Sequence, residues 1–197
     1  MALSGKSWVS KFPTSRDPED LASPFRENVK RFLQALQDAG CAVTISATYR
    51  PKERAYLMHY AYRIAREGLS PLSVPVLSGV DIQWDHRKAN GQLDASASRN
   101  AAEDMVLGYG IAFRPALNSN HTRRLAIDMT ITWSGSLKIK NAGGKTVNIS
   151  STPRTGQNSE LVGVGASYNV IKLQSDPPHW SSDGHLRTGR RTRKDRC

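Results

Sequence analysis

The chain has 197 residues, of which 38% are hydrophobic and 23% are charged, a composition typical of one soluble globular domain with its own core. Its 28 Lys and Arg residues against 17 Asp and Glu residues give a formal net charge of +11, which favours polyanionic surroundings such as a cell wall, an outer-membrane lipid or a nucleic acid. No apolar run has the length of a membrane span, Met1–Ser10 lacks the apolar core of a signal peptide, and two cysteines make no disulfide framework.

The first part of the chain predicts a lead-in, a helix and a strand. Residues 1–22 are polar and carry prolines, so we expect them to be irregular and to lie along the surface. Apolar residues at helical spacing follow Pro24, which is favourable at the first position of a helix, and Gly40 ends this helix. Residues 41–49 alternate between apolar and hydroxyl side chains and therefore predict a strand.

Two more helices and a loop-rich stretch occupy the middle of the chain. Pro51 begins a second helix over about 52–67, with a broad aromatic and apolar surface. Residues 69–94 are rich in loop-forming residues, and a third helix covers about 96–108.

The second half of the chain is mostly strands. Residues 125–133 alternate apolar with small or polar side chains, which predicts a strand with one apolar face. Residues 138–149 are predicted to be a hairpin because Asn, Ala and two Gly residues stand between two apolar pairs. A short helix over 158–165 and a strand over 168–173 complete the predicted elements.

This order of elements favours the α+β class, with a small antiparallel sheet packed against helices, because helices come first and strands mostly late. We predict a single catalytic domain over residues 1–186. Residues 187–197 contain six basic residues and one acid, and we expect them to be a disordered tail.

Two imidazoles and two carboxylates stand out in the second half: His121, Asp128, Asp176 and His179. Asp128 lies on the polar face of the predicted strand, between apolar neighbours that favour an inward position. The polar run 122–124 must form a turn if His121 is to reach the same face. Three such side chains can hold a catalytic zinc ion with one open position, and the fourth can act as a general base.

The spacing of these residues resembles that of a known group of zinc peptidases, the D-alanyl-D-alanine carboxypeptidases, VanX and VanY, and phage L-alanyl-D-glutamate endopeptidases. Their pattern is Ser-x-His-x-x-Gly-x-Ala-x-Asp, followed downstream by Glu or Asp-x-x-His. The matching residues here are Ser119, His121, Ala126, Asp128, Asp176 and His179, and the segment 46–50 resembles the strand that ends in Tyr-Arg in that group. The resemblance covers roughly residues 27–183, and it departs from the pattern at Arg124, where the group has glycine.

The resemblance implies a fold and a role for each matching residue. The fold would be that of the Hedgehog and DD-peptidase group, with Zn²⁺ held by His121, Asp128 and His179. Asp176 would be the catalytic base. Arg50 would bind substrate and polarise its carbonyl, a task that suits a planar guanidinium. Ser119 would orient a ligand or bind substrate.

We therefore expect a zinc-dependent peptidase that cleaves peptidoglycan stem peptides. Its expected partners are peptidoglycan and anionic envelope polymers, and we expect it to be a monomer. A protein made in the cytoplasm without a signal peptide but acting on the wall is typical of a phage or prophage endolysin that a holin releases. The sequence leaves endopeptidase and carboxypeptidase activity open, and with them the scissile bond.

Other interpretations of the same residues stay open. The histidines could be structural, Asp176 could cap the turn made by the prolines, and Arg50 could be a surface arginine. The chain could then be a catalytically weak, zinc-containing wall-binding module. It could also be a basic nucleic-acid-associated protein, although the tail lacks the stacking aromatics that specific binding would need. A second polar group, Asp81, Trp84, Asp85 and His86, is predicted to belong to a loop, with the alternative that it lines the cleft.

Overall fold

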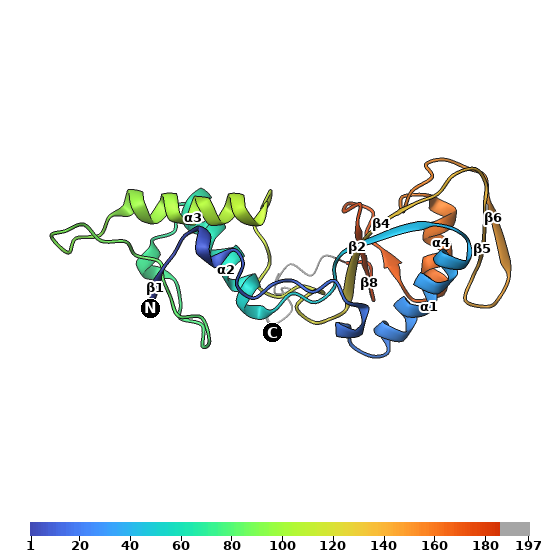
Figure 1. The fold of residues 1–197 in the computed structure, drawn as a ribbon, viewed down its shortest axis with the longest axis horizontal. Coiled ribbons are helices and arrows are strands. Elements are labelled where there is room, and N and C mark those ends of the chain that lie inside the picture. Colours follow the sequence, from blue (N-terminus) through green and yellow to red (C-terminus); the bar gives the residue numbers. More distant parts are fainter. Residues whose placement is uncertain (186–197) are drawn as a thin grey trace, which may run out of the picture. The chain divides into compact units, whose positions relative to one another are not determined.

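The structure is a computed structural model that describes residues 1–185, so the basic tail predicted over 187–197 lies outside the described residues (Figure 1). Its helices are α1 (Phe25–Asp38), α2 (Lys52–Arg66), α3 (Ala95–Tyr109) and α4 (Ser159–Ser167). Its strands are β1 (Ala2–Leu3), β2 (Ala42–Ala47), β3 (Ile82–Gln83), β4 (Ala126–Thr132), β5 (Leu137–Lys140), β6 (Thr146–Ile149), β7 (Ile171–Lys172) and β8 (His179–Ser181). This mixture of helices and small, mostly antiparallel sheets is compatible with the predicted α+β class.

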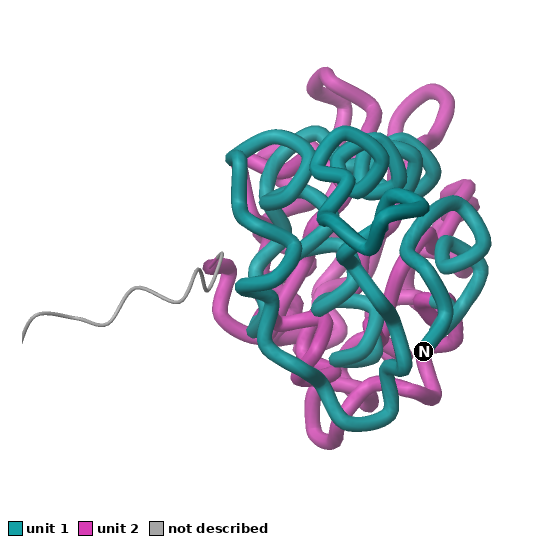
Figure 2. The backbone as a smooth tube through the Cα atoms, turned by 90° about the vertical axis from the view of Figure 1, so that its left-hand side faces the viewer, with its two compact units in different colours: residues 1–13, 51–118, 189–197 teal, residues 14–50, 119–188 magenta. Residues whose placement is uncertain are grey.

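The described residues form two compact units (Figure 2). Among the described residues, unit 1 comprises residues 1–13 and 51–118, and unit 2 comprises residues 14–50 and 119–185. Each unit has its own cluster of buried apolar side chains. The single domain predicted over residues 1–186 stays a prediction.

The main sheet belongs to unit 2 and has the strand order β2-β4-β8-β7, with every neighbouring pair antiparallel. The alternation in β4 gives the sheet two different faces, as predicted, because successive side chains in a strand point to opposite sides. Ile127, Met129 and Ile131 are buried on one face. Thr130 and Thr132 are exposed on the other face, which also carries Asp128.

One face of helix α1 packs into the apolar core of unit 2, because the apolar residues of the helix lie on that face. Its fully buried residues are Phe25, Val29, Phe32 and Leu36. The helix ends at Asp38, and Gly40 follows in the left-handed region with φ +79°, a conformation that glycine adopts without steric cost. The predicted helix between Pro24 and Gly40 is therefore confirmed.

The other predicted elements of unit 2 are found with one correction. The hairpin is present as β5 and β6, and α4 begins after Asn158, whose side-chain oxygen accepts hydrogen bonds from the N–H groups of Glu160 and Leu161. The strand predicted over 168–173 is wrong for its first residues. Tyr168 is the C-cap of α4 and Asn169 has a positive φ of 58°, so only Ile171–Lys172 is extended and paired.

Unit 1 is built on α2 and α3, as predicted for both helices, with the short parallel pair β1 and β3 beside them. Its core is rich in aromatic residues and includes Trp8, Tyr56, Tyr60 and Trp84. Within residues 1–185, every helix is too short or too polar to cross a lipid bilayer.

Candidate metal centre

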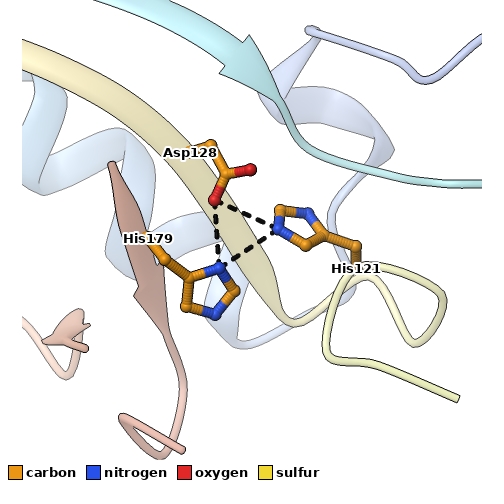
Figure 3. Close-up of side chains that lie close together, drawn as sticks. All are labelled: His121, Asp128 and His179. Carbon is orange, nitrogen blue, oxygen red and sulfur yellow. Dashed lines mark hydrogen bonds and ion pairs between the residues drawn. The ribbon is translucent and has the colours of Figure 1, made fainter. Parts of the chain in front are cut away.

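The three predicted ligands, His121, Asp128 and His179, meet on the polar face of the main sheet (Figure 3). The Nε2 atom of His121 lies 3.1 Å from Oδ1 of Asp128, and the Nδ1 atom of His179 lies 3.0 Å from the same oxygen. The two ring nitrogens are 3.2 Å apart. These three atoms thus form a nearly equilateral triangle, and the group could hold a metal ion.

The size of this triangle fits a small tetrahedral cation. Zinc binds nitrogen and oxygen ligands at about 2.0–2.1 Å, so a tetrahedral site separates its ligand atoms by about 3.3–3.4 Å. The observed separations of 3.0–3.2 Å are within a few tenths of an ångström of that value. Calcium needs a larger cage of six to eight oxygen ligands, which two imidazoles and one carboxylate do not supply.

The sheet register positions two of the three side chains. Asp128 on β4 is directly opposite His179 on β8, so both side chains project from the same face at the same level. His121 comes from the loop before β4, where residues 121–124 form turns. This is the turn that the sequence analysis required to bring His121 back toward Asp128.

The tautomer of His121 leaves a lone pair for a metal. Its Nδ1–H donates to the backbone carbonyl of Thr48 at 2.8 Å, so Nε2 carries no proton in the neutral ring and faces the other two ligands. Thr48 follows an irregularity between Ile45 and Ala47, where the pairing of β2 with β4 shifts. This β-bulge bends the end of β2 and presents the Thr48 carbonyl to the ring.

The surroundings keep Asp128 ionised. Burial by itself would raise the pKa of this carboxyl, but hydrogen bonds and positive charge from the protonated rings of His121 and His179, which apply when no metal takes the place of those protons, outweigh burial and lower the pKa well below its usual range. The side chain of Asp128 is 18% exposed, against 5% for each histidine, so the centre opens to solvent on the Asp128 side. When both rings are neutral and these nitrogens carry no proton, three electron-rich atoms converge in a largely buried place and repel one another unless a cation lies between them.

Arg124 stands where the resembling peptidases have glycine, and the backbone explains that pattern. Its φ is +64°, in the left-handed region that glycine adopts freely and other residues adopt at a cost. The guanidinium of Arg124 lies 4.3 Å above the ring of Tyr49, a cation–π contact that offsets part of this cost. The turn after His121 is thus formed without glycine.

Asp176 is near the centre along the chain but is not joined to it. The residue is half-buried in the turn between β7 and β8, and its backbone carbonyl accepts from the N–H of His179. Among the described residues, no hydrogen bond or ion pair links the Asp176 carboxylate to His121, Asp128 or His179. Its predicted role as a base stays a prediction.

Arg50 and Ser119 are both tied to the loop of His121. The backbone N–H of Arg50 donates to the carbonyl of His121 at 3.2 Å, so the backbone of Arg50 lies next to that of a predicted ligand. The Ser119 hydroxyl accepts from the N–H of Thr122 at 3.3 Å and thereby stabilises the turn. The roles predicted for Ser119, orienting a ligand or binding substrate, and the substrate-binding role predicted for Arg50 stay predictions.

The sequence analysis missed Lys172. This lysine is buried, and its ammonium group donates to the backbone carbonyls of Leu173 and Asp176 at 2.6 Å and of His179 at 3.2 Å. Burial lowers the pKa of Lys172, while the charges of Asp176 and Asp128 act in the opposite direction. The signal in the sequence is a lysine within an otherwise apolar run, Val170-Ile171-Lys172-Leu173.

The second polar group lies in unit 1, and each member has a local partner. Trp84 is buried and donates to the hydroxyl of Tyr56 at 3.2 Å. The remaining pairs are Asp81 with the amino terminus, Asp85 with Arg87, and His86 with the hydroxyl of Ser4. These contacts agree with the prediction that the group belongs to a loop.

The chain matches no protein-family model, and no curated protein is similar to it at a significant level. The fold and the geometry of the metal centre are therefore the observations on which a function can be argued.

Proposed function

We propose that the protein is a zinc-dependent peptidase that cleaves the stem peptides of peptidoglycan. The observation that carries the proposal is the triangle of His121 Nε2, Asp128 Oδ1 and His179 Nδ1, with edges of 3.0–3.2 Å. Two imidazoles and one carboxylate are a ligand set of catalytic zinc sites, which leave a fourth position open. The exposed side of Asp128 gives that position access to solvent and substrate.

Zinc at such a centre would lower the pKa of water and polarise the peptide carbonyl. The roles of the protein groups follow from their places in the fold. His121 is held in one tautomer by the Thr48 carbonyl, which keeps the ligand atom oriented before any metal binds. Asp176 lies three residues before His179, and we assign it the proton transfer from the attacking water to the leaving amine.

Arg50 completes the proposed catalytic group. Its backbone is bonded to the carbonyl of His121, and its guanidinium would bind the substrate and stabilise the negative charge that develops on the carbonyl oxygen. A sheet with the metal centre on one face and helices α1 and α4 on the other is the arrangement that the resemblance to the Hedgehog and DD-peptidase group leads us to expect.

The choice of peptidoglycan rests on the motifs and on the charge. A formal net charge of +11 favours attraction to anionic envelope polymers, which would concentrate the protein, as a monomer, on a wall substrate. The same charge would attract nucleic acid, but no feature of the metal centre calls for that partner.

Zinc analysis and wall digestion together test the proposal. Purified protein should carry about one zinc ion per chain and should release peptide fragments from peptidoglycan, with the new termini identified by mass spectrometry. His121→Ala and His179→Ala should lose both properties. His185→Ala, at an exposed position of the same unit, is the matched control and should keep both. A protein that neither contains nor binds zinc would contradict the proposal.

A zinc-containing wall-binding module is the second candidate, and one observation favours it. The carboxylate of Asp176 makes no hydrogen bond with the three metal-binding side chains. The same experiment separates the two candidates. A module would contain zinc and bind peptidoglycan, but mass spectrometry would find no new termini after digestion.

A further inference from the structure

Lys172 is an unusual residue for the interior of a small protein unit. It is 4% exposed, although lysine is almost never fully buried without compensating partners. No carboxylate within residues 1–185 forms an ion pair with it, since its three acceptors are all backbone carbonyl oxygens. A buried ammonium group that donates all three N–H bonds to main-chain carbonyls requires the backbone to hold those carbonyls in one particular arrangement.

That shape is the turn between β7 and β8. The three carbonyls belong to Leu173, Asp176 and His179, which are the first residue, the middle and the last residue of the turn 173–179. Backbone hydrogen bonds reinforce the same turn, from Asp176 N–H to Leu173 O and from His179 N–H to Asp176 O. The ammonium group is therefore the point at which both ends and the centre of the turn meet.

Apart from Lys172, backbone hydrogen bonds hold the turn, including those from Leu173 N–H to His179 O and from Met129 N–H to Pro178 O, and much of its surface faces solvent. Its positions 174, 175 and 177 are exposed, and β7 contributes only two residues to the sheet. Yet the turn ends at His179, whose Nδ1 must stay within 3.2 Å of two other ligand atoms. Because metal affinity depends on such preorganisation, the group that fixes the turn also affects the metal centre.

We propose that Lys172 is a positioning residue of the metal centre, which gathers the three carbonyls of the turn 173–179 and so holds His179 in line with Asp128 and His121. Lys172 touches neither metal nor substrate in this role. The inference rests on one part of the proposed function, the binding of zinc by His121, Asp128 and His179. It can be tested without measuring peptide hydrolysis.

The experiment compares Lys172→Met, which keeps the length of the side chain without its charge, with Lys138→Met at an exposed position of β5 in the same unit. Zinc affinity is measured by chelator competition, and the absorption spectrum is recorded at saturating cobalt. Lys172→Met should bind zinc at least about tenfold more weakly, the scale expected when a supporting hydrogen-bond network is lost, and its cobalt spectrum should change. Lys138→Met should match the unchanged protein in both.

The cobalt spectrum separates positioning from general stability. A residue that only stabilised the fold would leave the spectrum of the folded, cobalt-saturated protein unaltered. Lys172→Arg, which keeps the charge, should recover part of the zinc affinity. Equal zinc affinity and equal spectra for Lys172→Met and the unchanged protein would overturn the inference, whereas absence of zinc binding in the unchanged protein would overturn the proposed function itself.

A second measurement needs no variant, and it decides the matter if Lys172→Met does not fold. Since Lys172 and not the metal is proposed to hold the turn, the amide protons of Asp176 and His179 should be protected from hydrogen exchange in the zinc-free, unchanged protein. Free exchange of these two amides without zinc would show that the metal orders the turn, and the inference would fail.

Discussion

Asp128 and Asp176 lie in very different surroundings. Asp128 contacts both histidines of the candidate metal centre through one carboxylate oxygen, on a strand in the middle of the sheet. Asp176 is on a turn, where its backbone carbonyl accepts a hydrogen bond from Lys172. Its carboxylate makes no hydrogen bond with His121, Asp128 or His179. The first environment suits a ligand, and the second suits a group that exchanges protons with water.

Replacing each carboxylate by an amide should separate the two roles. Asp176→Asn should keep the zinc content near one per chain and lose two or more orders of magnitude in turnover, which is roughly the contribution of a general base. Asp128→Asn should weaken zinc binding itself, and excess zinc should restore part of the activity. Zinc stoichiometry and turnover are measured on both proteins. Loss of zinc from Asp176→Asn with retention by Asp128→Asn would reverse the assignment.

The positive φ of Arg124 should affect the free energy of unfolding of variants at this position. Arg124→Gly removes a backbone cost of about 1 kcal/mol and also the cation–π contact with Tyr49, worth about 0.5–1 kcal/mol at an exposed site, so its stability should stay close to that of the unchanged protein. Arg124→Ala loses the contact and keeps the cost. The glycine variant should therefore be more stable than the alanine variant by about 1 kcal/mol in urea unfolding, and the opposite order would show that φ does not limit this position.

Helix α4 contains two glycines with opposite surroundings. A Cβ atom at Gly165 would lie 2.5 Å from the ring of Trp180 and 3.0 Å from the carbonyl oxygen of Val170, whereas a Cβ at Gly163 would meet nothing within 4 Å. The close approach at Gly165 brings the helix onto strand β8, where Trp180 follows the predicted ligand His179.

Alanine at each position tests this packing. Gly163→Ala should stabilise the protein by up to about 1 kcal/mol through helix propensity. Gly165→Ala should destabilise it by about 1–3 kcal/mol because the ring of Trp180 must move, and it should weaken zinc binding through the neighbouring His179. Chemical unfolding and zinc titration check both. Equal stability of the two variants would mean that α4 does not pack on β8 as described.

The elements that the sequence predicted well have a strong periodic signal. The alternation of residues 125–133 predicted β4 and the face of Asp128, and helical spacing predicted α1, whose buried residues Phe25, Val29, Phe32, Ala35 and Leu36 recur at that spacing. Short elements were less well predicted: β7 is two residues long because Asn169, a residue type that tolerates positive φ, follows the C-cap of α4 in the left-handed conformation.

The candidate site was predictable only as a set of residues. Motif spacing brought together His121, Asp128 and His179, and the register of β4 with β8 explains two of them. The Thr48 carbonyl and the three acceptors of Lys172 are backbone groups, whose positions depend on a bulge and a turn. Side-chain patterns do not specify such backbone acceptors, although Lys172 itself stands out within an apolar run.

At the scale of the whole molecule, the metal centre belongs to unit 2 alone. Zinc at about one hundred times its dissociation constant should stabilise a structure that binds it only when folded by about 2.7 kcal/mol. Hydrogen exchange should show slower opening of β4 and β8 when zinc is added and faster opening after chelation, with smaller changes in α2 and α3 of unit 1. Equal changes in both units would show that they unfold together.

The basic residues beyond the described part make the last prediction. Removing Arg187–Cys197 takes away six of the 28 Lys and Arg residues and should weaken binding to anionic cell walls at low salt, because exposed charges are screened as ionic strength rises. Cleavage of a small soluble peptide should not change. Sedimentation with walls and a peptide assay, both at two salt concentrations, check this. Parallel loss of both activities would mean that these residues belong to the folded catalytic part.

The hydrogen bond between Arg50 and His121 has a consequence for how this chain can diversify. The polypeptide chain leaves unit 2 after Arg50 and re-enters it at Ser119. The hydrogen bond from Arg50 N–H to His121 O keeps these two points of the chain close together. Because unit 2 itself closes the gap, an insertion of almost any length between these points costs little extra entropy. The length of the segment Pro51–Asn118 can therefore change without moving the two backbone groups that hold the loop of His121.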